Sequence, residues 1–361
     1  MDNRRIWNRI PRLKPTTEDV YFSRRKLIKQ LGYGGMIAAV SCALPLPRTE
    51  AADDLEVEAF RKQVLDSGLS GKVIKGKFPA NRNEKFDGKG VKLTDELVAG
   101  THNNFYEFIP GRGGPVYRFV DKFVIDPWKI EVSGECMKPT TFDLDDLFKF
   151  DQEERVYRFR CVETWAMDVP WTGVQFSKLL EKVQPKASAK YVRFVTANDR
   201  KTMPGVDYSI KWRHGYKWPY HEALRMDEAM NELTLMATGI FGRPLPKQHG
   251  APARIVAPWK YGYKSPKSIV KIELTEKKPP TFWSSGPYAH EYGFLSNINP
   301  NIPHPRWSQA SEYMLVAGAS KLTAPRRKSL IFGGYGEFVG KMYPNAPTKP
   351  QKALGPGQIA R

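Results

Sequence analysis

The sequence is poor in the residues that most often build metal centres and disulfide frameworks. It has three cysteines and six histidines in 361 residues. Cys42 lies in the N-terminal segment treated below, so Cys136 and Cys161 remain, and two cysteines alone cannot complete a structural zinc site. Five histidines show no metal-ligand spacing: His102, His214, His221, His290 and His304. The two cysteines therefore either pair with each other or act singly, and a single thiolate reserved for a metal is one of these options.

Long apolar runs are also missing. No stretch reaches the roughly 20 mostly apolar residues that a membrane-spanning helix needs. The chain has no G-x-G-x-x-G after a predicted strand, no G-x-x-x-x-G-K-S/T and no C-x-x-C-H. The usual signatures of dinucleotide binding, of phosphate-binding loops and of covalently attached haem are therefore absent.

Acidic residues are outnumbered by basic ones, 38 against 57, which gives a formal net charge of +19. A basic protein can attract nucleic acid, anionic lipid or acidic partners. The chain has no nucleic-acid motif, so we expect no nucleic-acid partner. We expect the positive field to hold an anionic cofactor and to favour docking to a membrane partner, with solubility alone as the alternative.

The N-terminal segment carries an ordered export pattern. Ser23–Lys29 reads Ser-Arg-Arg-Lys-Leu-Ile-Lys, residues 30–47 carry no charge, and Thr49–Ala51 is a small-residue cleavage site. This succession predicts a twin-arginine signal peptide over residues 1–51. That route exports folded proteins, so we expect a periplasmic protein that receives a cofactor before export. The alternative is a basic surface helix with a chance pair of arginines.

The remaining chain mixes strand and helix patterns. Alternating or apolar segments predict strands at 128–132, 156–162, 191–196, 253–257 and 268–275, and amphipathic segments predict helices at 142–150, 176–183 and 224–230. No regular βαβ rhythm is present, which favours an α+β fold with mixed sheets over a doubly wound sheet. We expect one domain over residues 52–343, because no interior linker or repeat is visible. Residues 344–361 are rich in Pro, Lys and Gly and are predicted to be a flexible tail.

The densest chemical signal surrounds Cys161. This cysteine ends a predicted strand and starts a polar and aromatic loop. If the strand is regular, Arg158 and Arg160 lie on the face opposite Cys161. We expect basic neighbours to favour the thiolate, which suits a soft or high-valent metal. The alternative is that Cys161 is a small buried hydrophobic residue, as free cysteines commonly are.

The Cys161 segment resembles the molybdenum-ligand segment of the sulfite-oxidase fold family. Within that family, it is most similar to the catalytic subunits of periplasmic protein-methionine-sulfoxide reductases. Four further segments match in the same order: Asn103–Phe108, Asp227–Met230, Pro258–Lys264 and His304–Ala310. The resemblance runs from the leader to about Glu337. It implies the molybdopterin-binding fold of that family, with one molybdenum held by one pterin dithiolene and by the Cys161 thiolate.

The resemblance also implies the residues that contact the cofactor. They are Asn103, Tyr106, Glu107, Thr196, His249, Arg254, Ser265, Pro266 and Lys267. The phosphate of molybdopterin suits Lys, Arg and backbone N–H groups, and its pterin suits the hydrogen bonds of Asn, Thr and Glu. His249 stands where the family pattern has asparagine, so the contact is expected to be pH-sensitive near neutrality. By contrast, Asp227 and Glu228 are expected on the solvated side of a helix.

The function implied by the resemblance is the reduction of methionine sulfoxide in periplasmic proteins. The electrons would come from a membrane-embedded haem b subunit and the quinone pool, because this chain has no haem signature. One alternative is a sulfite dehydrogenase on the same fold. It is disfavoured because residues 163–167 are acidic and apolar, whereas a dianionic substrate needs converging arginines. A non-catalytic periplasmic binding protein is the other alternative, and it would contain no molybdenum.

Overall fold

The computed structural model describes residues 50–69, 74–109, 115–206 and 216–352. The predicted signal peptide lies outside the described residues except for its last two positions. Within the described ranges, no helix combines the length and the apolar character that crossing a membrane requires.

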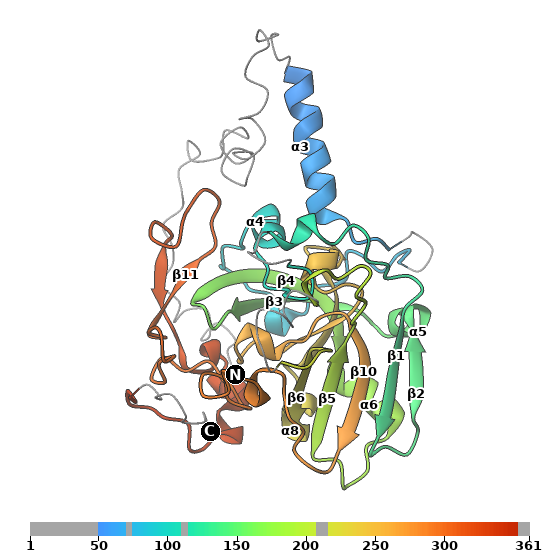
Figure 1. The fold of residues 1–361 in the computed structure, drawn as a ribbon, viewed down its shortest axis with the longest axis vertical. Helices are drawn as coiled ribbons and strands as arrows, with labels where there is room; N and C mark the ends of the chain where they lie inside the picture. The colour runs from blue at the N-terminus through green and yellow to red at the C-terminus, as the bar shows by residue number, and fades with distance from the viewer. Residues whose placement is uncertain (1–49, 70–73, 110–114, 207–215, 353–361) are drawn as a thin grey trace.

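Two mixed β-sheets form the body of the protein (Figure 1). The five-stranded sheet has the order β2-β1-β10-β5-β6, and its strands are β1 (Lys129–Gly134), β2 (Thr140–Asp143), β5 (Tyr191–Thr196), β6 (His221–Arg225) and β10 (Ile269–Thr275). β1 and β10 are parallel, and the other neighbours are antiparallel. This mixture agrees with the predicted α+β class.

The seven-stranded sheet is built around β4 (Trp165–Gln175). Its other strands are β3 (Glu153–Arg160), β7 (Leu235–Ile240), β8 (Arg243–Pro244), β9 (Arg254–Val256), β11 (Ser311–Met314) and β12 (Arg326–Lys328). β4 pairs antiparallel with β3 and β7 and parallel with β11. Both β3 and β4 are buried along nearly their whole length, which requires every charged side chain on them to find a partner.

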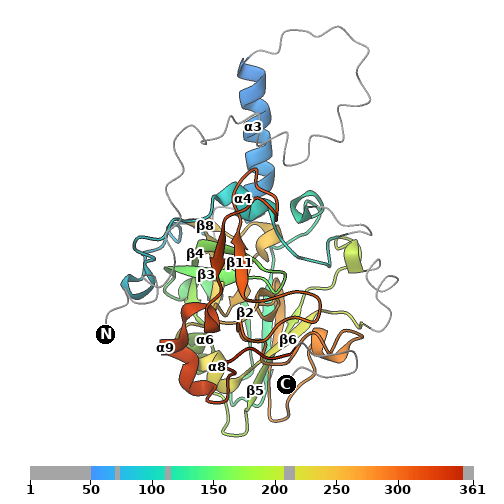
Figure 2. The same cartoon turned by 90° about the vertical axis from the view of Figure 1, so that its left-hand side faces the viewer.

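The described residues also form helices. They are α3 (Glu50–Leu65), α4 (Glu96–Thr101), α5 (Leu144–Lys149), α6 (Phe176–Val183), α8 (Met226–Met230) and α9 (Gly336–Val339). Single 3-10 turns lie at Glu84–Phe86, Val116–Arg118, Lys247–His249, Gly262–Lys264, Trp283–Ser285, Ile331–Gly334 and Gly340–Met342. α3 projects from the body, and Val64 near its end packs with Leu97 and Tyr117 (Figures 1 and 2).

Two sequence predictions on this fold are wrong. The helix expected at 224–230 begins only at Met226, because Leu224 pairs with Val192 inside the five-stranded sheet. Glu228 is not solvated: it is fully buried and its carboxylate lies 2.8 Å from Nζ of Lys260. Of the two acidic residues expected on the solvated side of this helix, only Asp227 is exposed.

The described part of the predicted tail, residues 344–352, contains no helix or strand. The Pro347 carbonyl nevertheless accepts hydrogen bonds from the amides of Asn299 (2.8 Å) and Asn301 (3.2 Å). This stretch therefore lies against the body of the protein.

Candidate cofactor site

Cys161 sits in the tight turn that joins β3 to β4. Its N–H donates to the Trp165 carbonyl at 2.9 Å, and the N–H of Thr164 donates to the Cys161 carbonyl at 3.1 Å. Thr164 adopts a φ of 75°, which is a rare conformation for a residue with a branched side chain. Cys161 is 7% exposed. The turn presents its sulfur to a pocket between the two sheets.

Two N–H donors lie close to the Cys161 sulfur. The Asn104 amide lies 3.7 Å from Sγ and the Glu163 N–H lies 3.5 Å from it. Burial raises the pKa of the Cys161 thiol well above its ordinary value, and the Glu163 carboxylate adds to this effect. Arg160 and Lys267 favour the thiolate, as expected of basic neighbours, but in the protein alone they do not outweigh burial. A bound metal removes the obstacle, because it deprotonates a coordinating thiol.

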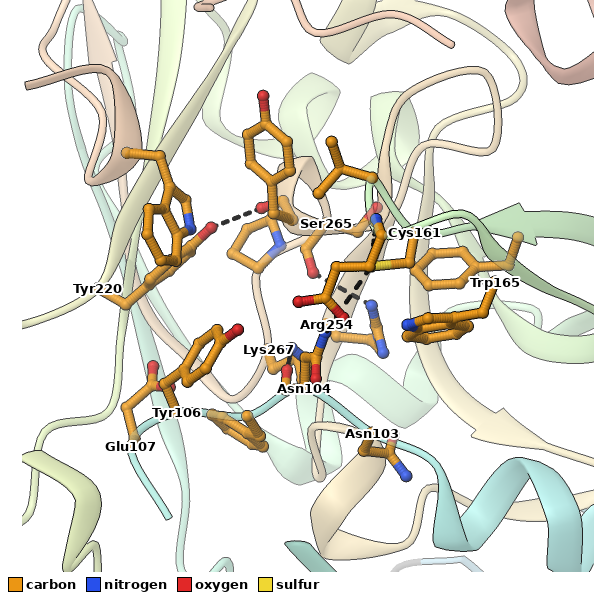
Figure 3. Close-up of a pocket in the computed structure, with 18 of the residues that line it drawn as sticks. Asn103, Asn104, Tyr106, Glu107, Cys161, Trp165, Tyr220, Arg254, Ser265 and Lys267 are labelled. Carbon is orange, nitrogen blue, oxygen red and sulfur yellow. Dashed lines mark hydrogen bonds between the residues drawn. The ribbon is translucent and has the colours of Figure 1, made fainter. Parts of the chain in front are cut away.

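The pocket gathers most of the residues that the sequence singled out (Figure 3). Eight of the ten lie on its wall: Asn103, Tyr106, Glu107, Cys161, Arg254, Ser265, Pro266 and Lys267. They come from the loop after α4, the end of β3, strand β9 and the segment before β10. The site therefore forms where strand ends of both sheets meet.

Two predicted residues do not line the pocket but support residues that do. The Thr196 hydroxyl donates to Oε1 of Glu107 at 3.4 Å and to the Tyr220 carbonyl at 3.2 Å. The His249 carbonyl accepts a 2.8 Å hydrogen bond from Nη1 of Arg254. Thr196 and His249 thus act through Glu107 and Arg254 in this geometry.

Asn103 is on the wall, but its amide is already engaged. Nδ2 donates to the carbonyls of Ala99 (3.2 Å) and Gly100 (3.1 Å), which belong to the last turn of α4. The end of α4 therefore holds this side chain in place, and the same two carbonyls also accept from the His102 N–H and the Gln248 amide.

Arg254 is a buried cation without a counter-charge. It is 1% exposed, and no carboxylate pairs with it within the described residues. Its guanidinium donates to the carbonyls of Ile255, His249 and Ser265, and it lies over the rings of Phe159 and Trp171. Burial lowers the pKa of Arg254 to about 9. A buried charge in this state is stabilised by a bound anion.

Lys267 and Glu107 extend this charged region. Nζ of Lys267 donates to the Asn104 carbonyl at 2.8 Å. Burial lowers the pKa of Lys267 to about 8, and the nearby Arg254 acts in the same direction. Burial raises the pKa of Glu107 to about 7, with Lys267 opposing the shift. Two cations at this end of the pocket thus repel each other until an anion binds.

His249 lies just behind Arg254. Its Nδ1 is buried and has no hydrogen-bond partner among the described residues. Burial, with Arg254 and Lys267, lowers the pKa of His249 to about 3. The imidazole is therefore neutral near pH 7, and the expected pH sensitivity near neutrality is wrong. An unpartnered buried nitrogen is what a hydrogen-bonding ligand would satisfy.

The residues present fit an anionic, metal-containing pterin. The set supplies one thiol for a metal, an arginine without a carboxylate partner and a lysine for a phosphate, and polar side chains for a heterocycle. Several aromatic members of the wall were not predicted as site residues, although Tyr263 lies inside the matched segment Pro258–Lys264; they are Trp165, Tyr220, Tyr263, Trp283 and Tyr292. Asn104 was also passed over, although it lies inside a matched segment.

This fold, with a lone cysteine facing a cationic pocket, defines a molybdopterin-binding oxidoreductase. The family model described as the oxidoreductase molybdopterin binding domain matches residues 117–283.

Comparison with relatives of similar sequence places the chain in one family within this class. The protein-methionine-sulfoxide reductase catalytic subunit MsrP of Burkholderia mallei is 42% identical over 92% of this chain and 93% of its own length. The subunits of the same name from Xanthomonas axonopodis pv. citri and Pseudomonas syringae pv. tomato are 40% and 42% identical, over 94% and 91% of this chain and 97% and 93% of their own. The chain belongs to the family of protein-methionine-sulfoxide reductase catalytic subunits.

Among solved structures, the sulfane dehydrogenase SoxCD from Paracoccus pantotrophus is 16% identical, with a TM-score of 0.37. The match covers 68% of this chain and 56% of that one. This likeness is too weak to support a conclusion about the site.

Proposed function

We propose that the protein is a molybdenum enzyme that reduces methionine sulfoxide residues in proteins to methionine. The single observation that carries the proposal is that a lone thiol, Cys161, shares the wall of one pocket with two cations, Arg254 and Lys267, of which Arg254 has no carboxylate partner among the described residues. Membership of the reductase family supports the substrate, because the relatives carry that activity in their names.

The chain's own residues would divide the binding of the cofactor between them. Cys161 Sγ would be the protein ligand of one molybdenum. Arg254 and Lys267 would bind the phosphate end of one molybdopterin, with the His249 Nδ1 beside them. The pterin would be held by Asn103, Tyr106, Glu107, Ser265 and Pro266, with Thr196 holding the Glu107 carboxylate in place.

When bound, the cofactor supplies two-electron oxygen-atom transfer, by which a sulfoxide with two electrons and two protons becomes a thioether and water. The protein orients the substrate and limits water at the buried sulfur. Asn104 helps to hold the Cys161 turn in place. Its amide bridges the Cys161 sulfur and the Glu163 carboxylate, which lies 2.9 Å away.

Sulfite is the less suitable substrate. Glu163 lines the pocket beside Cys161, and its carboxylate would repel a dianion. Arg254 would be occupied by the phosphate end of molybdopterin, and Arg158 is engaged by Glu312 on the other face of β3. No second function is favoured by a feature of the site.

We also propose that residues 1–51 direct the folded protein to the periplasm by the twin-arginine route. The support is the Arg24-Arg25 pattern, which lies outside the described residues. Replacing both arginines by lysine keeps the charge but removes the guanidinium pair. Mature protein should then stay in the cytoplasm, and an unchanged periplasmic yield would rule the proposal out.

A partner must supply the electrons. The relatives are named catalytic subunits, which supports a second subunit. We propose a membrane-embedded haem b protein fed by the quinone pool, because this chain has no haem signature.

Metal analysis together with two activity assays tests the enzymatic proposal. The purified protein should contain one molybdenum per chain and should oxidise a reduced dye with methionine sulfoxide. It should show no comparable activity with sulfite and cytochrome c. A protein free of molybdenum would favour the binding-protein alternative, and a preference for sulfite would favour the dehydrogenase.

A further inference from the structure

A second recess adjoins the cofactor pocket, and we call it the aromatic basin. It has a volume of about 590 Å³, and its characteristic members are Trp283, Tyr288, Tyr292, Arg306, Trp307 and Lys321. Trp283 and Tyr292 also line the cofactor pocket, as does Glu163. The basin is therefore the outer continuation of the cavity that contains Cys161.

Charge is ordered along this cavity. Glu163 belongs to both recesses and so marks the inner end, whereas Arg306 and Lys321 line only the basin. Lys321 is exposed and forms no ion pair within the described part of the chain. Arg306 has a side chain that is 55% exposed, and its Nη2 lies 2.7 Å from a Glu291 carboxylate oxygen. The outer rim of the basin thus carries two cations, and the end of the basin that meets the cofactor pocket carries one carboxylate.

One wall of the basin is fixed to the Cys161 turn. The Trp307 indole N–H donates to the Val162 carbonyl at 2.8 Å, and Val162 directly follows Cys161. The Trp307 ring stacks on His304 with centroids 3.8 Å apart and planes 5° apart. The Arg306 guanidinium carbon lies over the same indole, 4.7 Å from its ring centroid. The wall is therefore preorganised before any ligand arrives.

Exposed apolar side chains accompany the basin. Tyr288 on its wall is 41% exposed, and Leu322, the neighbour of Lys321, is 94% exposed. Leu322 stands on the loop that joins β11 to β12, and this loop extends from the body in Figure 1. Exposed apolar groups rimmed by charge are typical of a surface that binds another polypeptide.

We propose that the aromatic basin binds an extended segment of the substrate protein, and that Arg306 and Lys321 select segments with acidic residues a few positions from the methionine sulfoxide. The proposal rests on the proposed function and names its substrate class. Aromatic faces contact a polypeptide of almost any sequence, so the charges provide the selection. Glu163 disfavours an acidic residue directly beside the sulfoxide, and an extended chain moves about 3.3–3.6 Å outward per residue.

Three substrates test the proposal. They are free methionine sulfoxide, a Gly/Ser peptide with one central methionine sulfoxide and two aspartates three and four residues away, and the same peptide with lysines in place of the aspartates. With the holoenzyme, kcat/KM should be higher for the aspartate peptide than for the lysine peptide by about fivefold, the scale of one or two exposed ion pairs. Raising the salt concentration should reduce that ratio.

Charge reversal at the rim provides the variant. Lys321→Glu should abolish or invert the peptide ratio and leave free methionine sulfoxide unaffected. Lys138→Glu is the matched control, because it makes the same change of net charge at an exposed lysine in the β1–β2 turn, far from β11 in Figure 1. The control should keep the ratio of the unaltered enzyme.

Binding is measured separately from turnover. Fluorescently labelled versions of the two peptides, with methionine sulfone in place of the sulfoxide, should show the same preference in anisotropy titrations. The same ratio in Lys321→Glu and in the unaltered enzyme would overturn the proposal. Slower reduction of Lys321→Glu by its electron donor, with the peptide ratio unchanged, would show that the basin docks the donor instead. Selective sulfone binding with no reduction of any sulfoxide would instead overturn the proposed function and leave the basin as a peptide site.

Discussion

Buried arginines on the two faces of strand β3 differ in whether a carboxylate pairs with them. On the face away from the pocket, Arg158 and Arg160 both meet the buried carboxylate of Glu312, at 2.6 and 2.9 Å. Arg327 joins this cluster, binding Glu312 at 2.6 Å and taking both oxygens of Asp168. On the pocket face, Arg254 is equally buried, but its guanidinium donates to carbonyls and lies over aromatic rings, and no carboxylate among the described residues pairs with it.

This difference separates structural charge from ligand-binding charge. A buried arginine whose carboxylate partners come from its own chain contributes to the folded state without any ligand. A buried arginine without such a partner costs free energy until an anion arrives. Both kinds were invisible in composition, where each is one of 57 basic residues. Removing a paired charge should therefore lower stability and leave cofactor binding nearly unchanged. Removing Arg254 should instead lower cofactor binding.

The largest effect is expected at Cys161, which follows β3 and faces the pocket. Cys161→Ser should abolish methionine sulfoxide reduction and change the electron paramagnetic resonance spectrum of the Mo(V) state, because a hydroxyl does not replace the thiolate. The variant should remain folded by circular dichroism. Cys136→Ser is the control, since Cys136 is also buried and unpaired, and it should keep both activity and spectrum. Full turnover of Cys161→Ser would exclude Cys161 as the ligand.

On the paired face, Glu312→Gln should destabilise the protein by about 3–5 kcal/mol, the usual cost of leaving buried charges without their partner. Three arginines lose their shared carboxylate in this variant. Urea denaturation of the cofactor-free protein measures the change. Glu291→Gln, which removes a carboxylate at the more exposed Arg306, should cost less. Equal stability of Glu312→Gln and the unaltered protein would show that this cluster does not hold the fold.

Replacing Arg254, the buried arginine without a carboxylate partner among the described residues, should affect cofactor binding more than stability. Arg254→Ala should lower molybdopterin affinity by about tenfold to a hundredfold, the loss of roughly 1.5–3 kcal/mol from one charge-assisted contact. Arg158→Ala should instead lower stability and leave cofactor affinity nearly unchanged. Molybdenum and pterin content per chain, measured beside denaturation curves, separates the two variants. Equal cofactor occupancy in both would contradict the assignment of Arg254.

The smallest effect is a difference in pH dependence. Burial raises the pKa of Glu312, but Arg158, Arg327 and Arg160 outweigh it and lower the value to about 2. A depressed carboxyl pKa gives stability that is present above the unfolded value near 4.5 and is lost as the pH falls toward 2. Glu107 has the opposite sign, because its pKa is raised to about 7. Its contribution to stability is present below pH 4.5 and is lost as the pH rises through 7.

The cofactor-free protein should therefore lose stability in acid and also on going from about pH 5 to 8. Glu107→Gln should remove the second loss, on the order of 2 kcal/mol, and leave the first. Thermal unfolding across this range measures both. A neutral-pH loss that is unchanged in Glu107→Gln would show that another group is responsible.

Local pattern alone was enough for several elements. The helix predicted at 176–183 and the strand predicted at 191–196 have the same bounds in the structure as α6 and β5. In α6 the residues Phe176, Leu179, Leu180 and Val183 repeat at helical spacing on the buried face. In β5 every second residue is buried. Periodicity therefore fixed these elements, because it depends only on neighbours along the chain.

The sequence by itself also determined the lone cysteine at a strand end, the mixed-sheet class and the family, because motifs and their order are properties of the chain. Only the tertiary structure decided which charges are paired. Glu228 meets Lys260, and Arg158 meets Glu312, more than 30 and 150 residues away. It also brought Trp283 to the pocket of Cys161 and Trp307 to the carbonyl of the next residue, Val162. Burial and long-range pairing set the chemistry of these side chains, and neither is encoded in the residues next to them.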